Sequence, residues 1–220
     1  MTVLIAGINH TDPTMRQELV KWLTECSAGF AKPDFIAVEW DREIYWRVNV
    51  QRARFRRLLK EQWVDASEGL LNTLTLSLGY EGDSHLEVFP ADTVETLWLD
   101  EGRQYREGDI ARFAEHRLAL YRWYLPDWPQ GATDLDILSR ISQGAANDVG
   151  PLPEAGDERD AKFARRIAQR IAQGVAHNWA IAVVGKNHAL EIQGSMLRLL
   201  ECGECNCKVE MFRGRASQEV

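Results

Sequence analysis

Short apolar runs set the pattern of this chain, and glycine or charged residues bound each of them. Two such runs cover residues 2–7 and 180–184, a third lies at 35–38, and a fourth, at 86–89, is interrupted by Glu87. A short run that is apolar throughout is typical of a buried strand in a parallel sheet. We therefore predict strands at these four ranges and a last strand near 207–212.

Between these runs, apolar residues recur every three or four positions, as in helices that bury one face. Asp12 and Pro13 suit the N-cap and the first turn of the first such segment. The glycines and prolines of 149–157 predict a loop. The predicted helices cover 12–29, 42–64, 66–78, 93–101, 109–125, 133–146, 158–175 and 195–202.

The elements follow the order strand–helix–strand at both ends of the chain, with a mostly helical middle. This order predicts an α/β fold, with a mixed, largely parallel central sheet flanked by helices. The length of 220 residues allows one large domain, and we expect a single domain over 1–220. A helical insertion at approximately 42–147 would form a cap.

Composition narrows the classes of partner. The net charge of −7 argues against general nucleic-acid binding. The first apolar run is too short for a signal peptide, and no run is long enough to span a bilayer. We therefore expect a cytoplasmic protein with no membrane partner. Its partner would be a small-molecule or peptide substrate, and the formation of a homodimer stays open.

The four cysteines fit the same compartment, because thiols stay reduced in the cytosol. Cys26 stands alone, whereas Cys202-x-x-Cys205-x-Cys207 approaches the spacing of a zinc site. No second pair of ligands accompanies that cluster, so ordinary free thiols in a loop are the favoured interpretation.

One phrase occurs twice, at opposite ends of the chain. Gly7-Ile8-Asn9-His10 follows the first predicted strand, and Gly185-Lys186-Asn187-His188 follows the run at 180–184. Residues just past the carboxyl ends of parallel strands line the ligand crevice of such sheets. If the two strands are neighbours, the two imidazoles meet over one pocket. Such a pair suits a metal site or acid–base chemistry.

Three further residues are candidates for the same site. Glu39 ends a buried strand, which is a poor place for an idle carboxylate. Asp41 is a candidate substrate contact, but it is also well placed to N-cap the next helix. Arg159 opens a helix, where a cation is unfavourable unless it is paired with Glu39 or with a substrate anion. Its neighbours Glu158 and Asp160 are explained by the helix dipole alone.

These motifs together resemble the TraB/PrgY/GumN family, which includes the Tiki proteases and is related in fold to erythromycin esterase and ChaN. The resemblance covers Gly7-x-x-His10, Val38-Glu39, Glu158-Arg159-Asp160 and Val184-Gly185-x-x-His188. It implies catalytic roles for His10, Glu39, Arg159 and His188. It also implies an Asp-Arg pair after the third strand, of which this chain has only the aspartate, in Asp92-Thr93. Asp92 is therefore a second candidate substrate contact.

The resemblance implies a hydrolase that acts on a peptide or an ester bond. Two imidazoles and a carboxylate (His10, Glu39 and His188) are a suitable ligand set for Mn, Co or Zn. Glu39 could instead activate water with a histidine and without a metal, and Arg159 would stabilise the oxyanion. A non-catalytic ligand- or haem-binding signalling protein of the same fold is the alternative. Five tryptophans of the insertion would form the substrate groove: Trp46, Trp63, Trp98, Trp123 and Trp128.

Overall fold

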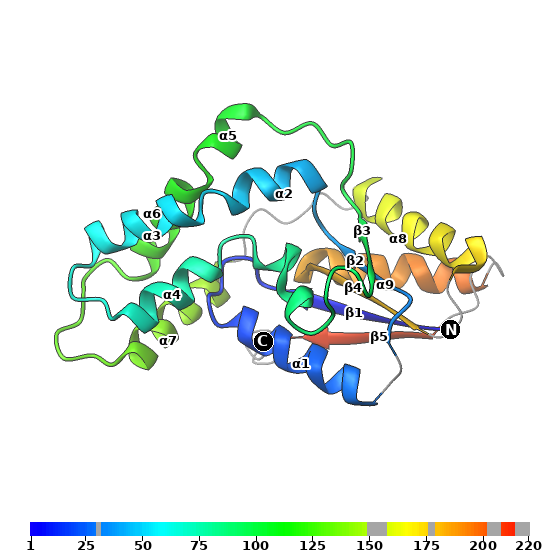
Figure 1. Ribbon diagram of the computed structural model, residues 1–220, viewed down its shortest axis with the longest axis horizontal. Coiled ribbons are helices and arrows are strands. Elements are labelled where there is room, and N and C mark those ends of the chain that lie inside the picture. Colours follow the sequence, from blue (N-terminus) through cyan, green and yellow to red (C-terminus); the bar gives the residue numbers. More distant parts are fainter. Residues whose placement is uncertain (30–31, 149–157, 176–178, 202–207, 214–220) are drawn as a thin grey trace.

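A five-stranded sheet forms the centre of the computed structural model, which describes residues 1–29, 32–148, 158–175, 179–201 and 208–213 (Figure 1). The strands are β1 (Thr2–Ile8), β2 (Phe35–Val38), β3 (Glu95–Trp98), β4 (Trp179–Gly185) and β5 (Lys208–Arg213). They are ordered β3-β2-β4-β1-β5, and every pairing in the described part of the chain is parallel. The α/β class is therefore confirmed, and the sheet is parallel rather than mixed.

Successive side chains of a strand point to opposite faces of the sheet, so the core has one layer on each face. Val3 and Ile5 of β1 pack in one cluster with helices α8 (Glu158–Arg170) and α9 (Lys186–Glu201). Leu4 and Ala6 point to the opposite face and pack against α1 (Met15–Gly29). Figure 1 shows α1 on one side of the sheet and the α8–α9 pair on the other. A π-helical turn (Ile171–Val175) follows α8 directly.

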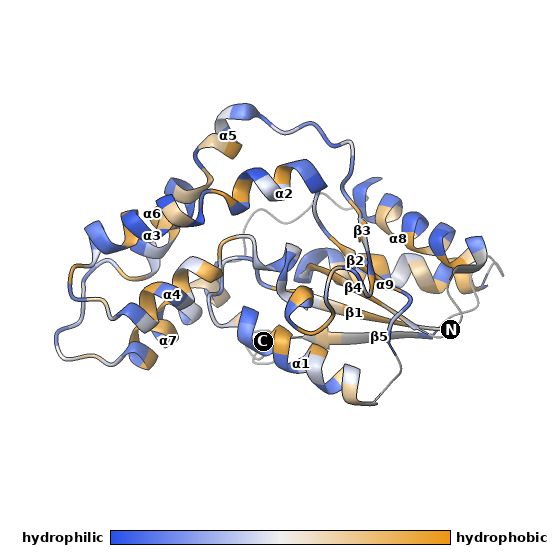
Figure 2. Cartoon of the chain, in the orientation of Figure 1, coloured by the Kyte–Doolittle hydropathy of each residue, from blue (hydrophilic) through white to orange (hydrophobic). Residues whose placement is uncertain are grey.

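The insertion forms a separate helical layer with its own apolar core. Its helices are α2 (Arg42–Asn49), α3 (Arg52–Gln62), α4 (Glu68–Leu76), α5 (Glu107–Ala111), α6 (Phe113–Tyr124) and α7 (Asp134–Asn147), with 3₁₀ turns η1 (Tyr80–Gly82) and η2 (Ser84–Glu87). Phe55, Leu74, Tyr121 and Ile141 are fully buried among these helices. Figure 2 shows their apolar faces turned inward. The range 42–147 also contains β3, so the insertion contributes a strand to the sheet.

Two of the predicted elements are wrong. The run at 86–89 is not a strand, because η2 covers Ser84–Glu87 and the amides of Val88 and Phe89 both donate to the His85 carbonyl. The range 93–101 is not a helix, because Glu95–Trp98 forms β3 at the edge of the sheet. An edge strand is only half-buried, so its apolar pattern is weak.

The remaining helices differ from prediction mainly at their boundaries. The range 42–64 divides into α2 and α3 near Val50, and 109–125 divides into α5 and α6 at Arg112. The predicted helix at 195–202 begins much earlier, at Lys186, directly after β4. His188 therefore lies in the first turn of α9.

No helix in the described part of the chain is long and apolar enough to cross a membrane. Cys26 is buried and is not part of a disulfide. The cluster of Cys202, Cys205 and Cys207 and the predicted loop at 149–157 lie outside the described residues.

Candidate active site

The carboxyl ends of four neighbouring strands bring the candidate site together. In the order of the strands across the sheet, Asp100 follows β3, Glu39 follows β2, His188 follows β4 and His10 follows β1. The register aligns Ile8 of β1 with Gly185 of β4, so the two Gly-x-x-His phrases end side by side. The predicted convergence of the two histidines is therefore a consequence of the strand order.

Glu39 occupies the middle of this row and is only 6% exposed. Its Oε2 atom accepts a hydrogen bond of 2.5 Å from the Gly185 amide and lies 3.4 Å from His10 Nε2. Its Oε1 atom lies 2.9 Å from Arg159 Nη2 and 3.5 Å from His188 Nε2. A buried carboxylate needs such partners to stay ionised, and Glu39 has them on both oxygens.

A second carboxylate holds each imidazole from its other ring nitrogen. Glu81, in η1, lies with Oε1 2.9 Å from His10 Nδ1, and Asp160, in α8, lies with Oδ1 2.6 Å from His188 Nδ1. A carboxylate at Nδ1 holds a proton on that nitrogen and fixes the orientation of the ring. Both imidazoles consequently direct Nε2 toward Glu39.

The charged groups lie so close together that they shift one another's pKa values. Burial opposes a charged His10, but the carboxylates of Glu81 and Glu39 outweigh it and raise the pKa of His10 to about 10. Burial likewise opposes ionisation of Glu39, yet His10, Arg159 and His188 lower its pKa to about 2. The pKa of Glu81 is also lowered, mainly by His10 against the effect of burial. At neutral pH His10 is therefore a positively charged imidazolium, and Glu39 is an ionised carboxylate.

Arg159 links Glu39 to the far end of the row. Its Nη2 donates to Asp100 Oδ2 over 2.6 Å, and its Nη1 lies 3.1 Å from His188 Nε2. Burial opposes the charge on Arg159, but Glu39 and Asp100 outweigh it and raise the pKa of Arg159. Tyr105 donates a further hydrogen bond of 2.7 Å to Asp100. The predicted pairing of Arg159 with Glu39 is confirmed, and Asp100 is a second partner.

A chamber of about 250 Å³ lies over this network. Its apolar walls come from the segment after β2 and from helices of the insertion: Trp40, Ile44, Val48, Ile110 and Phe113. Its polar lining includes His10, Glu39, Glu81, Arg117 and Arg159. Arg117, in α6, is only 5% exposed and donates to the His10 carbonyl over 2.5 Å. The insertion thus covers the site as expected, but an apolar chamber replaces the expected tryptophan groove.

The five tryptophans expected to form that groove lie elsewhere. Trp63 and Trp128 pack against each other in the core of the insertion, with ring centroids 5.8 Å apart. Trp98 lies on β3, and Trp46 and Trp123 are exposed. Since none of the five lines the chamber, that expectation is wrong.

The two expected substrate contacts lie outside the chamber lining. Asp41 caps α2, because its Oδ1 accepts from the amides of Glu43 and Ile44, and its Oδ2 accepts from the Gly102 amide. Asp92 is exposed ahead of β3. The aspartate that follows the third strand is Asp100, which the sequence assigned to a helix.

The predicted metal ligands meet, but their arrangement does not fit a metal ion. His10, Glu39 and His188 direct donor atoms toward one another, yet the Arg159 guanidinium already contacts Glu39 Oε1 and His188 Nε2. The described part of the chain contains no group of three or more His, Cys, Asp or Glu residues arranged to hold a metal. A bound cation at this point would face the positive charge of Arg159.

Sequence reasoning missed four members of the site. Asp160 lies in the quoted Glu-Arg-Asp motif, but its position in a first helical turn explained it without function. The misplaced third strand concealed Asp100. Glu81 and Arg117 come from irregular or amphipathic parts of the insertion, and no local pattern marks them.

The glycines of the two motifs provide room for close approach, and neither has a positive φ. A Cβ atom on Gly185 would lie 2.5 Å from His10 Nε2 and 3.2 Å from Glu39 Oε2. We expect Gly185→Ala to destabilise the protein by about 1–3 kcal/mol, because the rigid site cannot accommodate the methyl group. Urea unfolding followed by circular dichroism measures the change.

Gly108→Ala is the matched control, since a Cβ atom on Gly108 meets nothing within 4 Å. Its stability should stay equal to that of the wild type or rise slightly, because Gly108 lies in α5 and alanine favours helix. Equal stability of Gly185→Ala and the wild type would contradict the close packing of His10 and Glu39 over this glycine.

Comparisons with protein-family models, curated proteins and solved structures find no match to this chain. The resemblance to the TraB/PrgY/GumN family therefore stays a prediction, and the chemistry of the site has to be argued from its own geometry.

Proposed function

We propose that this protein is a hydrolase that cleaves an ester or peptide bond and works without a bound metal. The observation that carries the proposal is the position of Glu39 between a protonated imidazole and a guanidinium, at the edge of an apolar chamber. Acyl transfer to water requires a base, an acid and a cationic site for the oxyanion. The chamber lining contains a candidate for each.

The pKa values of Glu39 and His10 indicate which of the two acts as the base and which as the acid. Glu39, with a pKa of about 2, is ionised and accepts a proton from a water molecule that attacks the carbonyl carbon. His10, with a pKa of about 10, gives its proton to the leaving oxygen or nitrogen as the bond to carbon breaks. Glu39 then returns its proton to His10, whose Nε2 lies 3.4 Å away.

Arg159 provides the electrostatic part of the proposed reaction. Arg159 stabilises the negative charge on the carbonyl oxygen, and it is pre-oriented by Asp100 and His188. His188 is a positioning residue in this scheme, held by Asp160. The apolar walls of the chamber limit water, which strengthens these interactions.

The test of this proposal is hydrolysis of a panel of acyl esters and short peptides by purified protein, with and without EDTA. We expect turnover that survives the chelator and falls about 10²-fold in His10→Ala, because that variant lacks the general acid. His116→Ala is the control, since His116 is exposed on α6. Its rate should match the wild type.

Other outcomes separate the alternatives. Turnover that EDTA abolishes and that Mn²⁺, Co²⁺ or Zn²⁺ restores would overturn the metal-free mechanism and support the predicted metal ligands. Binding of a panel member without any turnover would overturn the hydrolase proposal and support the non-catalytic binder.

A further inference from the structure

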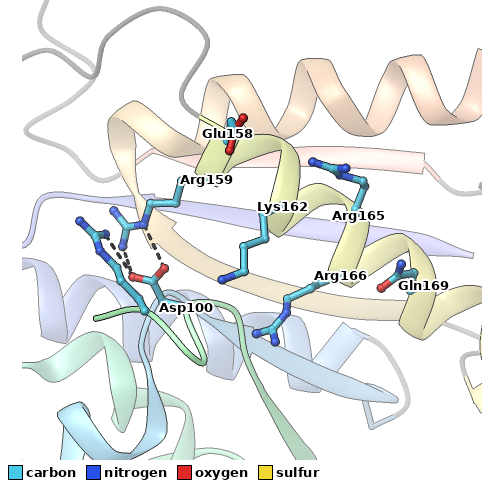
Figure 3. Close-up of a pocket in the computed structure, with 8 residues that line it drawn as sticks. Asp100, Glu158, Arg159, Lys162, Arg165, Arg166 and Gln169 are labelled. Atoms are coloured by element: carbon cyan, nitrogen blue, oxygen red, sulfur yellow. Dashed lines mark hydrogen bonds and ion pairs between the residues drawn. The ribbon is translucent and has the colours of Figure 1, made fainter. Parts of the chain in front are cut away.

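A second cavity of about 630 Å³ runs along α8, beside the chamber (Figure 3). One wall is the exposed side of α8 between Glu158 and Gln169, and the other begins at Asp100 after β3. From Glu158 to Gln169 the helix rises by about 17 Å, at 1.5 Å per residue. Figure 3 shows Arg159 and Lys162 extending from α8 toward Asp100.

Positive side chains dominate this groove although the chain as a whole carries a net charge of −7. The cations that line it are Arg103, Arg159, Lys162, Arg165 and Arg166, against the two carboxylates of Asp100 and Glu158. The lining has an excess of three positive charges, and four of its five cations lie on one face of α8.

Three of these five cations have carboxylate partners, because Arg103 and Arg159 both pair with Asp100 and Arg166 pairs with Glu101. Arg166 has structural partners, because it donates to the Trp98 and Leu99 carbonyls and pairs with Glu101. Within the described residues, no carboxylate lies within ion-pair distance of Lys162 or Arg165. Lys162 reaches only the Glu101 carbonyl, and Arg165 reaches the Ala161 carbonyl of its own helix.

Arg159 connects the groove to the proposed reaction site, because its side chain lines both cavities. An anion held along α8 would therefore lie next to the guanidinium that contacts Glu39. The different linings of the two cavities suit a substrate with an apolar end in the chamber and an anionic end in the groove.

We propose that the groove along α8 binds an oxyanionic group of the substrate, a phosphate or a carboxylate, through Lys162 and Arg165. This inference rests on the proposed function, since it assigns the charge of the substrate that the chamber would cleave. Guanidinium and ammonium groups bind both oxyanions by charge-assisted hydrogen bonds. The occupant is therefore anionic at the end away from the scissile bond.

The test is direct binding, measured by isothermal titration calorimetry with tripolyphosphate in one arm and tricarballylate in the other. The variants are Arg165→Glu and the double variant K162E/R165E, both on an exposed helix face. Arg122→Glu is the control and matches the change of charge in Arg165→Glu, because Arg122 is exposed on α6 and does not line the groove. Circular dichroism checks that each variant is folded.

We expect the wild type to bind at least one anion, with an affinity that falls as salt rises. The dissociation constant should increase at least tenfold in K162E/R165E and stay unchanged in Arg122→Glu. Stronger binding in one arm identifies the group as phosphate or carboxylate. Absence of binding in both arms, or equal affinity in all variants, overturns the proposal. Because binding needs no turnover, an inactive wild type that still binds would refute the hydrolase and leave the groove supported.

Discussion

Glu39→Gln is expected to lower the rate of hydrolysis by about 10⁴-fold, the largest effect on activity that the structure implies. Glutamine has nearly the same shape as glutamate and can still accept from the Gly185 amide. It cannot accept a proton from water or return one to His10, and it no longer balances the charge of Arg159. The measurement is kcat/KM on the best ester or peptide of the panel.

The control for this prediction is Glu43→Gln, which neutralises an exposed carboxylate on α2 and should leave the rate unchanged. Near-ultraviolet circular dichroism establishes that both variants keep the native packing. If Glu39→Gln retained activity within a factor of ten, Glu39 would not be the base, and the reaction would have to be placed elsewhere.

Arg159→Leu is expected to cost about 3–5 kcal/mol of stability, the largest loss from one substitution at this site. Leucine fills part of the space, but it leaves the buried carboxylates of Glu39 and Asp100 without their shared cation. Breaking a buried ion pair from one side costs this much, because the remaining charge is neither solvated nor paired. Guanidinium unfolding measures the difference.

Two comparisons make this prediction specific. Arg159→Lys keeps the charge but has no fork to contact Glu39 and Asp100 together, so its loss should be intermediate. Arg122→Leu removes an exposed arginine from α6 and should change the stability by less than about 0.5 kcal/mol. If Arg159→Leu were as stable as Arg122→Leu, the network around Glu39 would not contribute to folding.

Arg159→Leu should also change the dependence of stability on pH. Burial opposes ionisation of Asp100, but hydrogen bonds from Arg159 and Tyr105 outweigh it and hold its pKa below the usual 3.8. A lowered pKa means that the ionised carboxylate stabilises the fold above pH 3.8. This contribution is lost as the pH falls through the pKa of the folded state. The acid limb of the stability curve should therefore be shallower in Arg159→Leu than in the wild type.

Much of the fold was accessible from local pattern. The mainly apolar runs at 2–7, 35–38 and 180–184 correspond to β1, β2 and β4, because a strand buried on both faces contains few polar residues. The edge strand β3 was missed for the opposite reason. Its residues are exposed or half-buried, and Glu95 at its start reads as polar.

Local pattern likewise identified some residues of the site and missed others. Four of its members, His10, Glu39, Arg159 and His188, stand at the ends of predicted elements, where sequence position alone indicates a crevice. Asp160, Asp100 and Glu81 act through partners that are 28 to 71 residues away in the chain. No periodicity or motif encodes a contact over such a separation.

The sequence by itself determined that this chain forms buried parallel strands with a histidine after each of two of them, since burial and element type depend on nearby residues. Only the tertiary structure decided which strands are neighbours, which carboxylate holds each imidazole, and that a guanidinium lies where a metal was expected. Those outcomes depend on how separate elements pack, and packing is set by the whole core at once.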